Sequence, residues 1–253
     1  MPKYYLDTSA HMERVGGKTE IRDRLKAMLG REMHATSSQV LREWNRIVFV
    51  ACTKLLKVLP TAKDRMDVVN AMKQGYGREA ARNWQVTEWI MGPDEDFRLI
   101  EKRADDYARV RARAYFRAAT PTVRDGTDCA VAARVPYEVG RELRYKHTCE
   151  KDHEICRQPE FLSENLAKAK AAATALLGAR RKGDRKMGEK ALRALDALSN
   201  NGSKGKACWA GNGIGGDICI ALECAPDETL LAVDESFDYL CPALELEHEK
   251  IRH

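Results

Sequence analysis

The chain has 253 residues, of which 44% are hydrophobic and 32% are charged. This length and balance are typical of a soluble protein with a proper core, built as one large domain or two small ones. The sequence has no apolar run long enough to span a bilayer and no signal-peptide pattern, so we expect a cytoplasmic protein with no membrane partner.

The net charge and the cysteines indicate what kind of partner and which thiol state to expect. The net charge of +5, from 43 basic and 38 acidic residues, is compatible with a polyanionic partner but does not demand one. Eight cysteines in a chain of this length do not form the pattern of a disulfide framework. We therefore expect reduced thiols.

The first predicted element is a short buried strand over Tyr4 to Leu6, which delivers Asp7 at its carboxyl end. Thr8 and Ser9 follow, and we expect them to cap the next segment, shape the turn and hydrogen-bond nearby carboxylates. Apolar residues at helical spacing then predict a helix over residues 18–29, which Gly30 ends.

A second short strand is predicted over residues 33–37. Ser37 or Ser38 can cap the helix that follows, and Glu43 lies in its second turn. Strands that alternate with helices predict an α/β fold with a central parallel sheet covered on both faces.

The middle of the chain interrupts this alternation, and we predict an all-helical insertion over residues 61–204. Acidic clusters at 93–95 and 125–128 are interpreted as a helix start and a turn. The α/β core would then comprise residues 1–60 and 205–253, with a polar boundary at 200–205. Helical spacing places helices in this part of the chain over residues 58–72, 79–91, 94–118, 131–145 and 160–177.

Two segments of the insertion contain candidate binding residues. The basic stretch over residues 178–193 is either a phosphate-contacting surface or a solvated helix face. A thiolate and imidazole cluster further upstream can bind Zn²⁺, although its spacing matches no standard finger, and packing is the interpretation we favour. The phosphate-contact candidates, which would touch RNA if that is the partner, are Arg180, Arg181, Lys182, Arg185 and Lys186, and the zinc candidates are Cys149, His153 and Cys156.

Four acids occupy positions that suit a shared site. Asp7 and Asp234 end predicted strands, where parallel sheets place ligands, whereas Glu43 and Asp217 lie near predicted helix starts. Taken singly, a helix-start acid is explained by the helix dipole. Four converging carboxylates need a counter-charge, and Mg²⁺ or Mn²⁺ is the natural occupant.

These acids lie in runs that resemble the ordered motifs of the PIN-domain nucleases: YYLDTSA, ATSSQVLREW, GGDICIALECA and LLAVDESFDYL. The resemblance covers both ends of the chain. It implies a three-layer α/β/α fold in which Asp7, Glu43, Asp217 and Asp234 are the catalytic metal ligands. Thr8, Ser9 and Ser37 would support them.

The fourth motif departs from the family pattern. Ala232 stands where the family often has Thr, and Ser236 stands where an acid often precedes Phe237. The first three ligands are therefore better matched than Asp234.

The resemblance implies an endoribonuclease that hydrolyses RNA phosphodiester bonds with Mg²⁺ or Mn²⁺. Its members include toxins and defence nucleases, so RNA, an antitoxin or regulatory protein, and a second copy of the chain are the partners it suggests. The alternative is a non-catalytic PIN-fold module that binds RNA or protein, with the helical insertion as its working part.

Overall fold

The computed structural model describes residues 3–30, 33–74, 78–94, 96–120, 122–127, 134–140, 142–146, 157–201 and 216–251. Its central feature is a five-stranded sheet in the order β3-β2-β1-β6-β7, with every neighbouring pair parallel. The predicted α/β class with a parallel sheet is confirmed. The strands are β1 (Lys3–Leu6), β2 (His34–Ser37), β3 (Thr122–Arg124), β6 (Glu228–Ala232) and β7 (Glu247–Lys250).

Both faces of the sheet are buried, because successive side chains of a strand point to opposite faces. Tyr5 and Leu230 belong to the larger of two buried clusters, whereas Leu6 and Leu231 belong to the smaller one. Helix α2 covers the smaller cluster, and α3, α13 and α14 contribute to the larger one. This arrangement is compatible with a three-layer α/β/α fold.

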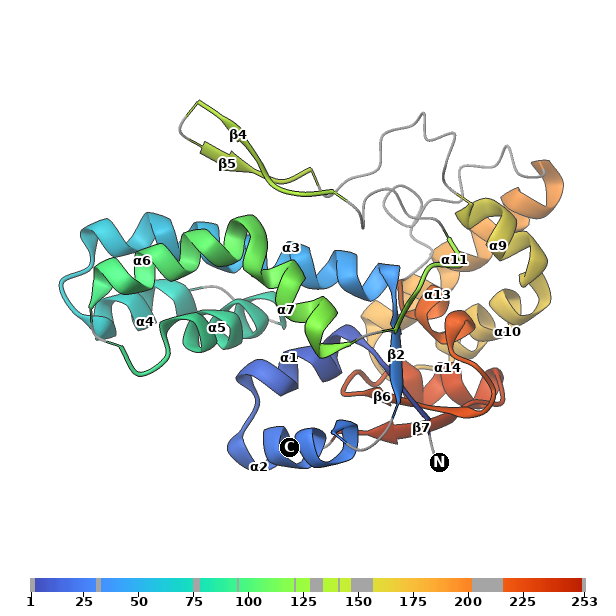
Figure 1. The fold of residues 1–253 in the computed structure, drawn as a ribbon. Coiled ribbons are helices and arrows are strands. Elements are labelled where there is room, and N and C mark those ends of the chain that lie inside the picture. The colour runs from blue at the N-terminus through green and yellow to red at the C-terminus, as the bar shows by residue number, and fades with distance from the viewer. Residues whose placement is uncertain are drawn as a thin grey trace.

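Helices supply most of the remaining described structure, and in the view of Figure 1 they lie to the left and to the right of the sheet. α3 to α7 gather on one side, and α9 to α11 on the other. A 3₁₀ turn (Leu59–Thr61) follows α3, and a π-helical segment, η2 (Tyr107–Arg111), joins α6 to α7. The helices are α1 (Thr8–Gly16), α2 (Thr19–Leu29), α3 (Ser38–Val58), α4 (Arg65–Lys73), α5 (Arg78–Met91), α6 (Phe97–Asp106), α7 (Ala112–Ala119), α9 (Gln158–Glu164), α10 (Leu166–Leu177), α11 (Lys182–Asn201), α13 (Gly216–Glu223) and α14 (Phe237–Ala243).

The expectation that residues 61–204 are all helical is wrong at three places. β3 lies within them and joins the central sheet beside β2. β4 (Tyr137–Val139) and β5 (Glu142–Arg144) form an antiparallel hairpin where a helix was expected over 131–145. The β-branched Thr122 and Val123 favour a strand, and Gly140, at φ 64°, provides the left-handed backbone of the hairpin turn.

The other helices expected between residues 61 and 204 are confirmed, with shifted boundaries, as α4, α5, α6 with α7, and α9 with α10. A further helix, α1, begins directly after β1 and was not separately expected. Its N-cap is Asp7 rather than Thr8 or Ser9, because the Asp7 carboxylate accepts the Ser9 N–H.

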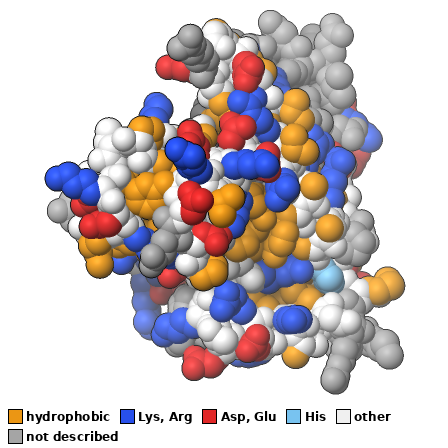
Figure 2. All heavy atoms as spheres, turned by 60° about the vertical axis from the view of Figure 1, so that its left-hand side comes forward, with side chains coloured by type: hydrophobic (Ala, Val, Ile, Leu, Met, Phe, Trp, Pro, Cys, Tyr) orange, Lys and Arg blue, Asp and Glu red, His pale blue; other side chains and the backbone are white. Residues whose placement is uncertain are grey.

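The surface is mixed in character. On the face that Figure 2 shows, basic and acidic side chains are interspersed with apolar patches. Within the described residues, no helix is long and apolar enough to cross a membrane.

One ion pair ties the edge of the sheet to its centre. Arg124, the last residue of β3, lies over the ring of Tyr5 at 5.5 Å and makes two bonds of 2.6 Å to the Glu228 carboxylate. The Glu228 side chain is only 3% exposed. A buried carboxylate of this kind depends on its partner.

We expect Arg124→Ala to destabilise the protein by about 3 kcal/mol or more, because Glu228 would keep a buried charge without its partner. The matched control is Arg144→Ala, which breaks an exposed pair with Glu142 and should cost less than about 1 kcal/mol. Equilibrium unfolding in urea measures both changes in stability. Equal destabilisation of the two variants would contradict the expectation.

Candidate functional site

The structure brings the four predicted acids together at the carboxyl edge of the sheet. Asp7 directly follows β1, Asp234 follows β6, Glu43 lies on α3 and Asp217 lies in the first turn of α13. Asp234 and Glu43 lie close enough to Asp7 and Asp217 for their charges to raise the pKa of both. Residues from both ends of the chain therefore form one cluster, which we call the acid cluster.

Ser9 fixes Asp7 within this cluster. Its backbone N–H and its hydroxyl donate to Asp7 Oδ2 at 3.0 and 2.6 Å. The same hydroxyl accepts the N–H of Val233 at 2.8 Å. Ser9 therefore links the end of β1 to the residue before Asp234, so that the two strand-end acids share one anchor.

Hydroxyl groups also position the other acids. Thr8 donates to Glu43 Oε2 at 2.7 Å, and Ser236 donates to Asp217 Oδ2 at 2.7 Å. Ser37 acts less directly, since its hydroxyl accepts the Val40 N–H at 3.1 Å and so caps the helix that carries Glu43. The supporting role expected of Thr8 and Ser9 matches these contacts.

Burial and mutual repulsion control the charge of the cluster. Burial, followed by the nearby charges of Asp234 and Glu43, raises the pKa of Asp7 to about 7. Burial, followed by Asp7 and Asp234, also raises the pKa of Asp217 well above its ordinary value. Both carboxyls therefore hold their protons to a higher pH than an ordinary aspartate does.

Arg82, on α5, is the functional residue that the sequence did not reveal. Its guanidinium donates to Glu43 Oε1 at 2.8 Å and to Asp234 Oδ2 at 3.2 Å. Burial acts to lower the pKa of Arg82, but Glu43, Asp234, Asp7 and Asp217 outweigh it and raise the pKa. Arg82 is therefore a counter-charge for the whole cluster.

The donor chemistry of the acid cluster fits a hard cation such as Mg²⁺ or Mn²⁺, which prefers carboxylate oxygens. Within the described residues, however, no three or more His, Cys, Asp or Glu side chains are arranged to hold a metal ion. Two of the four carboxylates, those of Glu43 and Asp234, are engaged by Arg82.

Four of the eight cysteines lie within the described residues. The zinc candidates Cys149, His153 and Cys156 lie outside the described residues. Cys52, Cys219, Cys224 and Cys241 are buried reduced thiols, as packing residues would be. Burial raises the pKa of Cys241 to about 12, which keeps it unreactive near neutral pH.

Part of the basic stretch borders the acid cluster. Arg181 pairs with Glu235, the neighbour of Asp234, at 2.8 Å. The backbone N–H of Arg180 donates to the Tyr239 hydroxyl at 3.2 Å. Arg185 instead donates to the carbonyls of Ala179 and Arg180, and so stabilises the turn before α11.

Lys182 and Lys186 complete the basic set, and both are exposed. Between them lies Asp184, an acid that the sequence interpretation passed over. Its Oδ2 is buried without a hydrogen-bond partner among the described residues. Burial raises the pKa of Asp184, Arg181 opposes the rise, and Asp234 and Glu235 add to it. The first turn of α11 therefore lies close enough to the acid cluster to interact with it electrostatically.

A second polar cluster lies beside β3. Asp125 follows β3 directly and accepts the Ser38 hydroxyl at 2.7 Å. Glu223 accepts the Gly126 N–H at 3.0 Å and the Tyr5 hydroxyl at 3.3 Å, and burial raises its pKa to about 7. The sequence interpretation treated Asp125 as part of a turn. The β-branched pair ahead of it was the available signal for a strand end.

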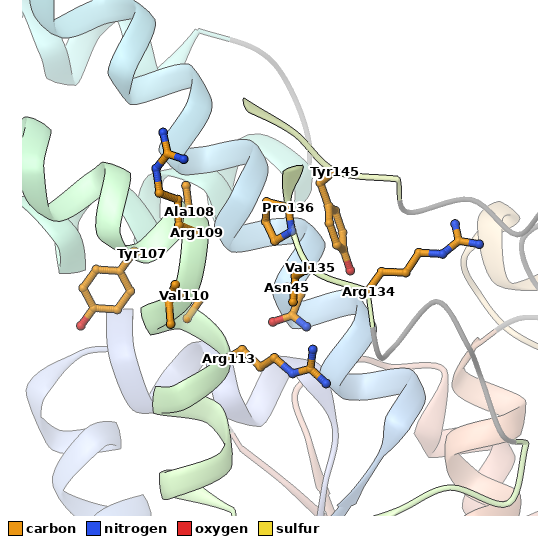
Figure 3. Close-up of a pocket in the computed structure, with 11 residues that line it drawn as sticks. Asn45, Tyr107, Ala108, Arg109, Val110, Arg113, Arg134, Val135, Pro136 and Tyr145 are labelled. Atoms are coloured by element: carbon orange, nitrogen blue, oxygen red, sulfur yellow. The ribbon is translucent and has the colours of Figure 1, made fainter. Parts of the chain in front are cut away.

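A cavity of about 320 Å³ lies between α3, η2, α7 and residues 134–136. Figure 3 shows Asn45 and Arg113 lying near one another beneath Val135 and Pro136, with Tyr145 close by. The lining also includes Arg109 and Arg134 but none of the four acids. It is therefore a separate feature from the acid cluster.

Comparison with known proteins adds no assignment. A scan against protein-family models, a search of curated proteins and a search of solved structures each found no match.

The raised pKa of Asp7 has a consequence for stability. Between pH 3.8 and about 7, the folded protein holds a proton that the unfolded chain has released. Stability should therefore fall as the pH rises through this window. We expect Asp7→Asn to stabilise the metal-free protein at pH 8 by on the order of a few kcal/mol and to have little effect near pH 4.

The control is Asp96→Asn, because Asp96 caps α6 in the same way but is exposed. Asparagine caps helices as well as aspartate does, so neither substitution should remove a cap. Thermal unfolding in EDTA from pH 4 to pH 8 gives the comparison. Destabilisation by Asp7→Asn at pH 8 would refute the argument.

Proposed function

We propose that the protein is a metal-dependent endoribonuclease of the PIN type. The observation that carries the proposal is the convergence of Asp7, Glu43, Asp217 and Asp234 at the carboxyl edge of a parallel sheet. Ligands of open parallel sheets bind at this edge. The order of the four acids along the chain also matches the order in the family's motifs.

The four carboxylates would hold Mg²⁺ or Mn²⁺, which would supply an activated water and stabilise charge developing on the phosphate. The chain's own hydroxyls prepare the ligands. Both Ser9 bonds fall on Asp7 Oδ2, and the Thr8 bond falls on Glu43 Oε2. The ligands are thereby oriented before an ion arrives.

RNA is the substrate we propose. The turn between α10 and α11 places Arg181 against Glu235, directly beside Asp234. Exposed Lys182 and Lys186 extend the positive charge from this point. A phosphate backbone that binds this turn would pass close to the acids. A role as a toxin or defence nuclease, with an antitoxin, regulatory or identical partner, follows from the resemblance alone.

The first test is cleavage of total cellular RNA in Mn²⁺. Because each acid is a proposed ligand, we expect Asp7→Asn and Asp217→Asn to lower the cleavage rate by about 100-fold or more. Asp238→Asn is the control, since Asp238 lies on α14 and pairs with Lys250. Cleavage by the Asp7 and Asp217 variants at the wild-type rate would exclude the proposal.

The second test concerns the exposed lysines at the start of α11. We expect Lys182→Ala with Lys186→Ala to weaken RNA binding and to lower the slope of log K against log salt by about 0.7 for each phosphate that the variant no longer binds. The paired control is Lys18→Ala with Lys26→Ala, which removes two exposed lysines at helix α2. Binding is measured by fluorescence anisotropy in EDTA. An unchanged slope in the 182/186 variant would show that this turn is a solvated helix face.

The second candidate function is a non-catalytic module that binds RNA or protein. One observation favours it: among the described residues, no group of three or more His, Cys, Asp or Glu side chains is arranged to bind a metal ion. Titration of the wild type and of Asp7→Asn with Mn²⁺ separates the two candidates. Binding that depends on Asp7 supports the nuclease, and its absence supports the module.

A further inference from the structure

Arg82 brings a positive charge into contact with the acid cluster. Its two terminal nitrogens contact one oxygen of Glu43 and one of Asp234, at 2.8 and 3.2 Å. These carboxylates come from α3 and from the loop after β6, and Arg82 comes from α5. One side chain thus joins three segments that are far apart in the sequence.

A guanidinium and a divalent ion compete for these carboxylates. Both need the same oxygens, and two cations within one small cluster repel each other. Arg82 already contacts Glu43 and Asp234, and among the described residues no group of three or more His, Cys, Asp or Glu side chains is arranged to hold a metal. In the described arrangement, Arg82 therefore occupies carboxylate oxygens that a divalent ion would also need.

Helix α5 itself is held firmly. A Cβ added at Gly16 of α1 would lie 2.7 Å from the Gln85 Cβ, so the two helices approach as closely as a glycine permits. One turn along from Arg82, Gln85 also donates to Glu13 Oε1 at 3.1 Å. The backbone that carries Arg82 is thus fixed on α1.

The Arg82 side chain has more freedom than its backbone. It is 21% exposed, and it reaches the acids through a long and flexible stem. In the proposal below, a change of side-chain rotamer would release Glu43 and Asp234 without movement of α5.

We propose that Arg82 is a built-in counter-ion that keeps the acid cluster closed to a divalent cation until its side chain swings away. This inference rests on the proposed function, because it assumes that the acids are metal ligands. It assigns to α5 a regulatory contact that acts within one chain. Metal affinity is then set by competition with Arg82 as well as by the four acids.

The test is calorimetric titration of the metal-free, full-length protein with Mn²⁺. We expect Arg82→Gln, which removes the charge but keeps much of the length, to bind Mn²⁺ about tenfold more tightly or better. Arg82→Lys keeps the charge and should bind within about threefold of the wild type. Arg109→Ala breaks an Arg–Asp pair outside the acid cluster and should leave the affinity unchanged.

A second measurement guards against misfolding of the variants. The rise in melting temperature caused by saturating Mn²⁺ should be larger for Arg82→Gln than for the wild type, because the neutral variant leaves two acids for the ion to satisfy. A smaller or equal rise, or an unchanged affinity, overturns the inference.

The outcomes also distinguish this inference from the proposed function. If neither the wild type nor Arg82→Gln binds Mn²⁺ in a manner that requires Asp7, both proposals fall. If both bind with the same Asp7-dependent affinity and Arg82→Gln merely cleaves RNA more slowly, the nuclease stands. Arg82 would then contact substrate rather than close the site.

Discussion

Repulsion among four carboxylates at one sheet edge is the constraint on which the site depends. Burying charge is costly unless it is neutralised or paired. Two features reduce this cost. The raised pKa values of Asp7 and Asp217 favour their neutral forms. Arg82 forms ion pairs with Glu43 and Asp234. Hydroxyl groups then hold the carboxylates in position. A cluster kept at this cost to stability is typical of a functional site.

The strand-end acids were predictable from the sequence because two simple rules combine. Tyr4 to Leu6 and Leu230 to Ala232 are short, mostly apolar runs that suit strands buried on both faces, and each is soon followed by an acid. The carboxyl ends of parallel strands meet at one edge, so Asp7 and Asp234 had to approach each other. The central part of the fold follows from local pattern in the same way.

Other features were beyond the reach of local pattern. β3 has only three residues and lies among helices, so its membership in the sheet depends on pairing with β2. Arg82 lies one helical turn before the buried Val86, so periodicity predicts which face of α5 it shares. It does not predict which distant acids that face will meet. That meeting depends on how α5 docks against α1 and α3, which is a property of tertiary packing.

The loop between β6 and α14 shows what the long middle segment contributes. Asp234 in this loop meets Arg82 of α5, and its neighbour Glu235 meets Arg181 of the turn before α11. Val233 is held by Ser9 from the start of the chain. Two separate parts of residues 61–204 therefore contact consecutive acids of one short loop. The middle segment forms part of the wall of the site, and differences within it would alter which ligands reach the acids.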